Sequence, residues 1–210
     1  MPHYLVSLIV CLWINLSLPY ALAGENSQSQ QQTILVVGDS ISAGFGIDKS
    51  QGWVALFESK LHQLSPHHKI VNASISGETS SGGANRINSL LAQYSPNWVI
   101  IELGGNDGLQ GRPIKIIKKN LDYMIKQSQQ AGAKVLLLGM RIPPNYGQTY
   151  SDLFAQQYQQ LAHTNDTLLL PFLLTDIAAK PDMMQVDGIH PTLKAQPIMM
   201  EAVWSVFIRK

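Results

Sequence analysis

The stretch "ILVVGDSISAG", residues 34–44, sets both the architecture of this chain and the position of its candidate nucleophile. Four apolar residues run into Gly38, and an acid and a serine follow at once. A short, fully apolar, β-branched run predicts a strand that is buried on both faces. A serine directly after such a strand is usually a helix cap or a turn former. Ser40 can also be a nucleophile, provided that a base and an oxyanion-binding site lie elsewhere in the chain.

The rest of the chain alternates apolar strands with amphipathic helices. Beyond residues 33–37, strands are expected at 69–74, 98–103, 134–140 and 167–172. Helices are expected at 53–64, 80–94, 113–132 and 151–163, with a last one running from near Pro191 towards the C-terminus. Continuous apolar strands separated by such helices predict a parallel sheet covered on both faces and joined by right-handed crossovers. We therefore expect an α/β fold, a single three-layer α/β/α sandwich of about five strands spanning residues 33–210.

The N-terminal residues are predicted to be a targeting segment. Leu5 to Leu18 is mostly apolar, and Ala21-Leu22-Ala23 has the small-x-small form that signal peptidase needs, so residues 1–23 are expected to be a signal peptide. A membrane span usually needs ~20 apolar residues, and this stretch is shorter. Alternatives are a buried helix, an uncleaved anchor, or a lipoprotein acylated at Cys11. Residues 24–32 are polar and are expected to form a flexible lead.

Cleavage after Ala23 would leave a mature chain without cysteine, because Cys11 is the only one. Such a chain has neither a disulfide nor a cysteine metal site. The signal peptide predicts a periplasmic or secreted protein with no stable membrane insertion after cleavage. A monomer is the default expectation.

Composition excludes several classes of function. The 210 residues are 45% hydrophobic and 14% charged, with a net charge of +1 and no run of Lys and Arg. This charge pattern gives no support for a nucleic-acid surface. The chain has no His-x-x-x-His pair and neither glycine-rich phosphate-binding motif, so we expect no metal site and no cofactor.

Polar, glycine-marked clusters follow the predicted strands. In a parallel sheet the carboxyl ends of the strands share one rim, where ligands bind. The rim is therefore expected to collect a serine, a glycine-rich turn, an asparagine and an Asp–His pair. In chain order these come from "GDS" (38–40), "SISGETS" (74–80), "GGND" (104–107), "RIPPNYG" (141–147) and "DGIH" (187–190).

The blocks "GDS", "SGET", "GGND" and "DGIHP", in this order, resemble those of the SGNH, or GDSL-type, hydrolases. The chain is most similar to their exported bacterial thioesterase I, lysophospholipase and arylesterase branch, and the resemblance extends from about Thr33 onward. It implies a flavodoxin-like fold without cofactor or metal. It also implies a Ser40 nucleophile, a His190 base and an Asp187 partner. The implied oxyanion donors are the backbone N–H groups of Ser40 and Gly77 and the side-chain amide of Asn106.

The residues themselves suit these roles. A serine hydroxyl needs a base, and Asp187, three residues before His190, can bend back to accept from the imidazole Nδ1–H and leave Nε2 facing Ser40. Gly77 allows close backbone approach, and the Asn106 amide donates without titrating. Pro191 is expected to begin the last helix and stiffen the chain beside His190. The plainer alternatives are a cap for Ser40 and turn roles for Gly77 and Asn106.

Other polar residues are expected to be structural. Asp39 and Asp107 are expected to brace their loops through hydrogen bonds, and Glu78 and Glu102 to be structural too. The histidines at 62, 67, 68 and 163 are expected to be solvated. Residues 107–113 are expected to be a flexible loop, and the resemblance implies that this loop closes over an acyl chain, with Leu109 in contact with it. Residues 143–147 are expected to form another wall, with Tyr146 nearby.

Three functions are compatible with these features. The first is a serine hydrolase of carboxylic esters and thioesters: lysophospholipids, acyl thioesters and aryl esters. The second is an esterase of the same mechanism that removes acetyl groups from polysaccharides. The third is an exported binding protein on the same scaffold. The first two take a small acyl ester or thioester as substrate.

Overall fold

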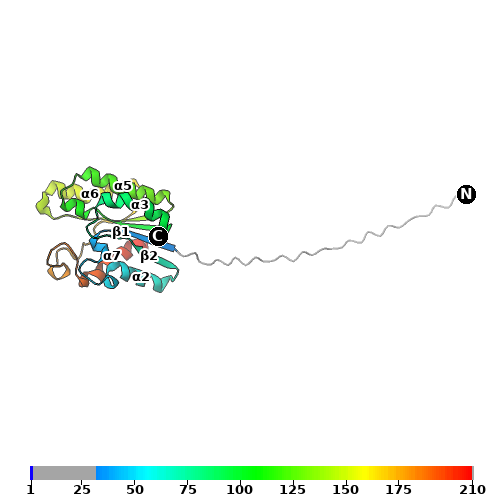
Figure 1. Cartoon of the computed structure of the whole chain (residues 1–210), viewed down its shortest axis with the longest axis horizontal. Coiled ribbons are helices and arrows are strands. Elements are labelled where there is room, and N and C mark those ends of the chain that lie inside the picture. Colours follow the sequence, from blue (N-terminus) through cyan, green and yellow to red (C-terminus); the bar gives the residue numbers. More distant parts are fainter. Residues whose placement is uncertain (2–31, 210) are drawn as a thin grey trace.

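The computed structural model describes residue 1 and residues 32–209 (Figure 1). The predicted signal peptide, residues 1–23, and the predicted lead, residues 24–32, lie outside the described residues apart from Met1 and Gln32. In the described part of the chain, no helix is long and apolar enough to cross a bilayer.

Five parallel strands form one sheet in the order β2-β1-β3-β4-β5. In register, Ile34 lies beside Ile70 on one side and beside Trp98 on the other, so β1 is an interior strand between β2 and β3. The strands are β1 (Gln32–Gly38), β2 (His68–Asn72), β3 (Trp98–Glu102), β4 (Lys134–Leu138) and β5 (Leu168–Leu170). The predicted parallel sheet of about five strands is confirmed.

Helices cover both faces of the sheet (Figure 1). On one face α3 (Ser80–Tyr94) packs on α5 (Ile114–Gln130), which packs on α6 (Gln148–Thr164). On the other face α2 (Trp53–Leu64) packs on α7 (Gln196–Phe207). The β1-to-β2 connection runs across the sheet in the opposite direction from the later connections. A constant crossover hand therefore places α2 on the face opposite α3, α5 and α6.

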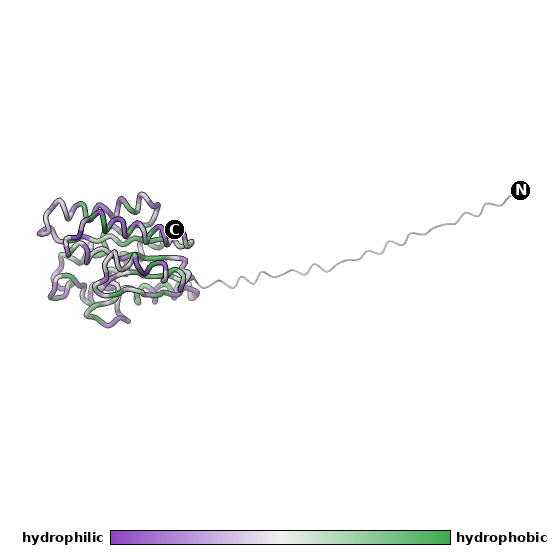
Figure 2. The backbone as a smooth tube through the Cα atoms, turned by 45° about the horizontal axis from the view of Figure 1, so that its top comes forward, coloured by the Kyte–Doolittle hydropathy of each residue, from purple (hydrophilic) through white to green (hydrophobic). Residues whose placement is uncertain are grey.

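The core lies between these layers. Every residue of β3 is buried, as are the last five residues of β1 and the last four of β4, which is why these strands read as unbroken apolar runs. Hydrophobic segments accordingly run through the middle of the body (Figure 2). Aromatic rings join α2 to α7, with the Phe57 and Phe207 centroids 5.2 Å apart at an interplanar angle of 87°. Such edge-to-face pairs add to the burial of apolar area.

The last helix begins later than the sequence predicts. Pro191 pairs with Met184 in an isolated antiparallel bridge, and the Thr192 N–H donates to the Met183 carbonyl, so the chain after His190 is still extended. A short 3-10 helix, Leu193–Ala195, precedes α7, and Pro197 is the proline in the first turn of α7. The expectation that a proline opens this helix is sound, but it applies to Pro197.

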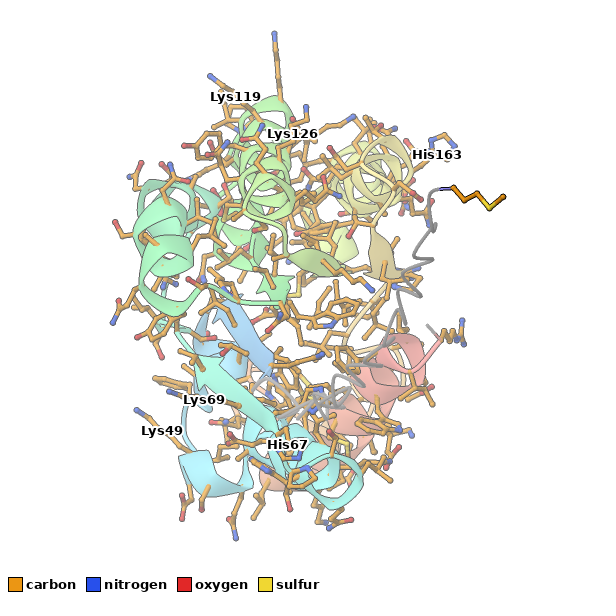
Figure 3. All side chains as sticks on the ribbon, turned by 90° about the vertical axis from the view of Figure 1, so that its right-hand side faces the viewer. Lys49, His67, Lys69, Lys119, Lys126 and His163 are labelled. Carbon is orange, nitrogen blue, oxygen red and sulfur yellow. The ribbon has the colours of Figure 1, made fainter. Side chains whose placement is uncertain are left out.

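Basic and imidazole side chains project from the surface at separate places (Figure 3). His62, His67 and His163 are exposed and His68 is half-buried, as the sequence predicts for solvated histidines. Lys119 and Lys126 extend from α5, whereas Lys49 and Lys69 lie at the other end of the view.

Candidate active site

The sheet order creates a crevice where the chain changes direction. From β1 the chain goes to β2 on one side, while β3 lies on the other, and such a switch point is where doubly wound sheets bind ligands. Ser40 begins α1 (Ser40–Ala43) directly after β1, and Asn106 lies in α4 (Gly105–Leu109) after β3. The two side chains therefore come from adjacent strands and meet at one rim.

The Gly-Asp-Ser turn is built by its own residues. Asp39 caps α1, because its Oδ1 accepts from the Ile41 N–H at 3.0 Å. Gly38 admits no side chain, since a Cβ there would lie 2.7 Å from the Ser42 Cβ. Gly44, at φ +75°, ends the helix in the left-handed region that glycine favours. Ser40 is thereby held at the first position of a one-turn helix, 8% exposed.

His190 connects Ser40 to Asp187. Its Nε2 lies 2.9 Å from Ser40 Oγ, and its Nδ1 lies 2.6 Å from Asp187 Oδ2. The other oxygen, Asp187 Oδ1, accepts from the backbone N–H groups of Ile189 and His190. The backbone and ring bonds from His190, together with the Ile189 N–H, lower the pKa of Asp187 to about 2. The structure thus brings the predicted serine, histidine and aspartate together, with the carboxyl group ionised over the whole neutral range.

The two remaining predicted oxyanion residues lie beside this chain of hydrogen bonds. Asn106 Nδ2 donates to Asp39 Oδ2 at 3.2 Å and to the Glu78 carbonyl at 2.9 Å. The second bond ties Asn106 to the turn that contains Gly77. Gly77 has φ +79° and nothing within 4 Å of the position where a Cβ would stand, so its backbone is open to close approach.

Two buried carboxyl groups lie behind the nucleophile. Asp39 is 2% exposed and Glu102 is fully buried, and Glu102 Oε2 accepts from the Asp39 N–H and from Ser42 Oγ. Burial raises the pKa of Asp39 to about 6. Burial, followed by the nearby charge of Asp39, raises the pKa of Glu102 well above its ordinary value. Both carboxyl groups are therefore harder to ionise in the folded protein than in water, because burial penalises their charged forms.

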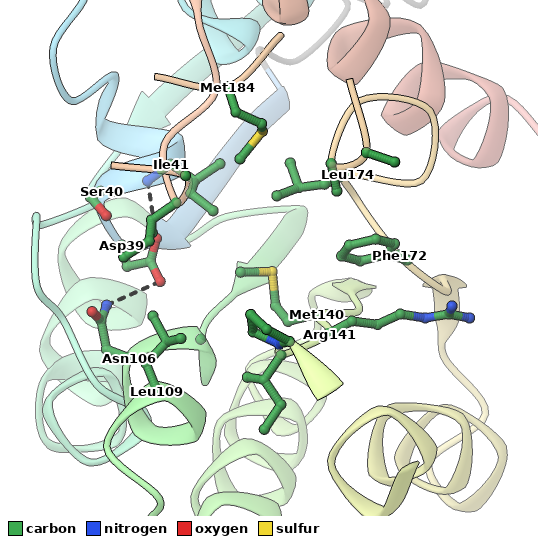
Figure 4. A pocket seen from close by; sticks show the side chains of 17 residues that line it. Asp39, Ser40, Ile41, Asn106, Leu109, Met140, Arg141, Phe172, Leu174 and Met184 are labelled. Carbon is green, nitrogen blue, oxygen red and sulfur yellow. Dashed lines mark hydrogen bonds between the residues drawn. The ribbon is translucent and has the colours of Figure 1, made fainter. Parts of the chain in front are cut away.

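An apolar pocket of about 370 Å³ opens beside Ser40. It extends from Ser40 and Asn106 towards Phe172 and Arg141 (Figure 4). Its walls consist mainly of aliphatic, thioether and aromatic side chains: Ile41, Leu109, Met140, Ile142, Pro143, Phe172, Leu174, Met184 and Ile189. This size and character suit an acyl chain, since ligand pockets are mostly apolar with a few polar groups at one end.

Of the two residues predicted to contact substrate, one lines the pocket and the other does not. Leu109 lines the pocket, as expected (Figure 4). Tyr146 is 41% exposed and is not among the lining residues, although Pro143 of the same segment is. The expected flexible loop at 107–113 is wrong in its first part, because residues 107–109 belong to α4. There Asp107 is fully buried and accepts from the N–H and hydroxyl of Ser80.

Comparison with known proteins agrees with this geometry. Residues 36–196 match the GDSL-like lipase/acylhydrolase family. The chain belongs to this family. Esterase TesA of Pseudomonas aeruginosa is 50% identical over 184 residues, which are 88% of this chain and 92% of the relative. A crystal structure of TesA, also 50% identical, covers 84% of this chain and 98% of its own with a TM-score of 0.82.

Two further relatives of this acylhydrolase are similar over most of their length. An arylesterase of Vibrio mimicus is 40% identical over 190 residues, 90% of this chain and 94% of the relative. The thioesterase 1/protease 1/lysophospholipase L1 of Escherichia coli is 42% identical over 169 residues, 80% of each chain.

Several residues of the site escape a sequence-only argument. The Phe45 ring lies 4.3 Å from the His190 ring, centroid to centroid, although nothing in "GFG" marks an aromatic residue for that place. The Arg141 guanidinium lies over the Phe172 ring at 5.4 Å, at the far end of the pocket. The sequence does contain a signal for the pairing of Asp39 with Glu102. Each of these acidic residues follows a run of apolar strand residues, so its side chain is expected to lie near the core.

Proposed function

We propose that this acylhydrolase cleaves carboxylic esters and thioesters through an acyl-enzyme formed on Ser40. The observation that carries the proposal is the unbroken hydrogen-bond chain from Ser40 Oγ through His190 to Asp187 at the open end of an apolar pocket. A serine, a base and an acid in this geometry perform acyl transfer on several unrelated folds. Family membership and the names of the relatives support the same chemistry.

His190 acts first as a base. As Ser40 Oγ attacks the carbonyl carbon and the C–O bond forms, the hydroxyl proton passes to His190 Nε2, 2.9 Å away. The Asp187 carboxylate keeps the other proton on Nδ1 and stabilises the imidazolium. A carboxyl group whose pKa is lowered to about 2 does not take that proton itself.

The tetrahedral intermediate places its negative charge near the start of α1. The donors are the backbone N–H groups of Ser40 and Gly77 and the amide of Asn106. In the structure, the Asn106 amide nitrogen donates both to Asp39 Oδ2 and to the Glu78 carbonyl. One bond must therefore be exchanged for the oxyanion, and the longer bond to Asp39, at 3.2 Å, is the one released. Each such donor contributes on the order of 10²–10³ in rate.

The acyl-enzyme forms when the bond to the leaving oxygen or sulfur breaks. His190 Nε2 returns its proton to that atom, so an alcohol or a thiol departs. Water then attacks the acyl carbon, His190 takes a proton from the water, and the second intermediate collapses to release the acid and restore the Ser40 hydroxyl.

The pocket favours acyl chains longer than acetyl. An acetyl group would leave most of a 370 Å³ apolar cavity unfilled, whereas each additional buried methylene adds about 0.8 kcal/mol of binding free energy. The pocket therefore favours lysophospholipid, acyl-thioester and aryl-ester substrates over acetylated polysaccharide. We further propose that residues 1–23 are removed on export and that the domain acts as a periplasmic or secreted monomer without metal or cofactor.

The test is hydrolysis of p-nitrophenyl esters of graded chain length, followed by acyl-CoA substrates, with wild type and Ser40→Ala compared. We expect the activity to peak beyond acetyl and Ser40→Ala to lose roughly 10³–10⁶ of kcat while folding normally. Hydrolysis of the acetyl ester alone would favour the polysaccharide esterase. A well-folded wild type that hydrolyses none of the substrates would favour the binding protein, and a Ser40→Ala enzyme that keeps its rate would remove Ser40 from the mechanism.

A further inference from the structure

Gln185 connects the loop that carries His190 to the turn that follows Ser40. Its side-chain Nε2 donates to the Phe45 carbonyl at 2.9 Å and to the Pro191 carbonyl at 3.1 Å. Its backbone N–H donates to the His190 carbonyl at 2.7 Å, and its own carbonyl accepts from the Gly188 N–H. One residue thus joins the nucleophile turn to both ends of the Asp187–His190 loop.

The loop needs such a connection because little else holds it. Residues 186–189 are exposed, and Val186 extends its apolar side chain into solvent, whereas Ile189 is partly exposed at the wall of the pocket. The Met184–Pro191 bridge closes the base of the loop but does not fix its distance from Ser40, which is 150 residues away in the chain. General-base catalysis depends on that distance, and a displacement of about 1 Å can cost on the order of 10²-fold in rate.

The turn after Ser40 is shaped to receive the Gln185 side chain. At Gly46, φ is +74°, and an added Cβ would lie 2.4 Å from Gln185 Oε1. The glutamine amide therefore sits directly on the Gly46 backbone, in space that a side chain at this position would fill. The Phe45 N–H donates to the Ser40 carbonyl at 3.0 Å, so the residue held by Gln185 is itself tied to the nucleophile.

The Phe45 ring lies against the His190 ring, while the Phe45 carbonyl accepts the hydrogen bond from Gln185. Its ring is 50% exposed and lies 4.3 Å from the imidazole, tilted by 33°. An aromatic face beside an imidazole shields it from water and favours the cationic form that develops when the Ser40 proton arrives. The carbonyl that Gln185 binds belongs to this same residue, so the glutamine sets where the ring lies.

We propose that Gln185 is a positioning residue for the reaction. By bridging the Phe45 and Pro191 carbonyls over Gly46, it holds the His190 imidazole at hydrogen-bond distance from Ser40 and against the Phe45 ring. This inference rests on the proposed serine-hydrolase function. It assigns Gln185 no contact with substrate.

Gln185→Met tests the proposal, because methionine keeps the length of the side chain and removes its donors. The matched control is Gln148→Met, which removes an exposed glutamine whose bond goes to Asp152 at the start of α6. We expect Gln185→Met to lower kcat by about 10- to 100-fold on a p-nitrophenyl ester with KM within about threefold of wild type. Gln148→Met should match wild type.

Titration with a fluorophosphonate separates positioning from partial unfolding. We expect Gln185→Met to reach the wild-type stoichiometry of labelling at Ser40, with a rate constant 10- to 100-fold lower. A reduced stoichiometry, or kinetics like those of the Gln148→Met control, would overturn the proposal. Should Gln185→Met misfold, the second variant is Gln185→Glu, which keeps the shape of the side chain and replaces the amide donor with an oxygen. It is expected to lose about 3- to 30-fold in kcat, and an unchanged kcat would overturn the proposal.

Failure of the proposed serine-hydrolase function would give a different result from failure of the Gln185 role alone. A wild-type enzyme that neither hydrolyses esters nor takes up the label at Ser40 would refute the serine-hydrolase mechanism and the positioning role with it. An active, fully labelled wild type whose Gln185→Met variant keeps its rate would refute the positioning role alone.

Discussion

Replacing Asp39 by asparagine should stabilise this protein more at neutral pH than at acid pH. Burial raises the pKa of Asp39 from 3.8 to about 6, so between these values the folded chain holds a proton that the unfolded chain has released. The free energy of unfolding therefore falls as the pH rises through this window. A pKa about two pH units above the ordinary value corresponds to about 3 kcal/mol. Asp39 is 2% exposed, so solvent screens little of this penalty.

Asparagine keeps the shape of Asp39 and cannot ionise. Its side-chain oxygen can still accept from the Ile41 N–H, but its amide nitrogen faces the Asn106 amide, where Asp39 presents an acceptor. The variant should therefore be more stable but less active than wild type. We expect kcat to fall by about 10- to 100-fold because the Asn106 amide is misoriented.

Urea unfolding of wild type and Asp39→Asn at pH 4, 5, 6, 7 and 8, at constant ionic strength, measures the effect. We expect the difference in unfolding free energy between the two proteins to grow in favour of the variant by about 2 kcal/mol from pH 4 to pH 7, because part of the full effect has already developed at pH 4. Asp176→Asn, at an exposed carboxyl group, is the control and should run parallel to wild type. Parallel curves for wild type and Asp39→Asn would show that Asp39 ionises normally in the fold and would refute the reasoning.

Three further predictions concern activity. The rate should fall as the pH is lowered from neutral, because the general base must be unprotonated to accept the Ser40 proton. Asp187, with its pKa lowered to about 2, stays ionised down to pH 4, and a flat pH–rate profile down to that pH would argue against a histidine base. Asn106→Ala should lower kcat by about 10²–10³ with little change in KM, measured on a p-nitrophenyl ester, and an unchanged kcat would remove its amide from the oxyanion site. Leu174→Trp, which fills part of the pocket, should lower kcat/KM for dodecanoyl esters at least about tenfold more than for acetyl esters, and equal losses would place the acyl chain elsewhere.

The layered architecture and the rim follow from the pattern of apolar and polar residues along the chain. Apolar runs such as residues 34–37 and 98–101 can only be interior strands, and parallel strands bring their carboxyl ends to one edge. That edge collects Ser40, Asn106 and the Asp187–His190 pair in the way the blocks predict. The local signals were sound because strand burial, capping and turn formation depend on neighbouring residues. The predicted start of the last helix is wrong because Pro191 pairs with Met184 in an antiparallel bridge that keeps the chain extended there.

Which side chains meet across the rim depends on how distant segments pack in the folded chain. The contact of Phe45 with His190, the bridge made by Gln185 and the far wall of the pocket at Phe172 each join segments more than 30 residues apart. The raised pKa of Asp39 likewise arises from its burial beside Glu102, 63 residues away. Periodicity records which face of an element is buried but carries no information about what lies opposite, because that depends on how the layers pack and how the loops cross.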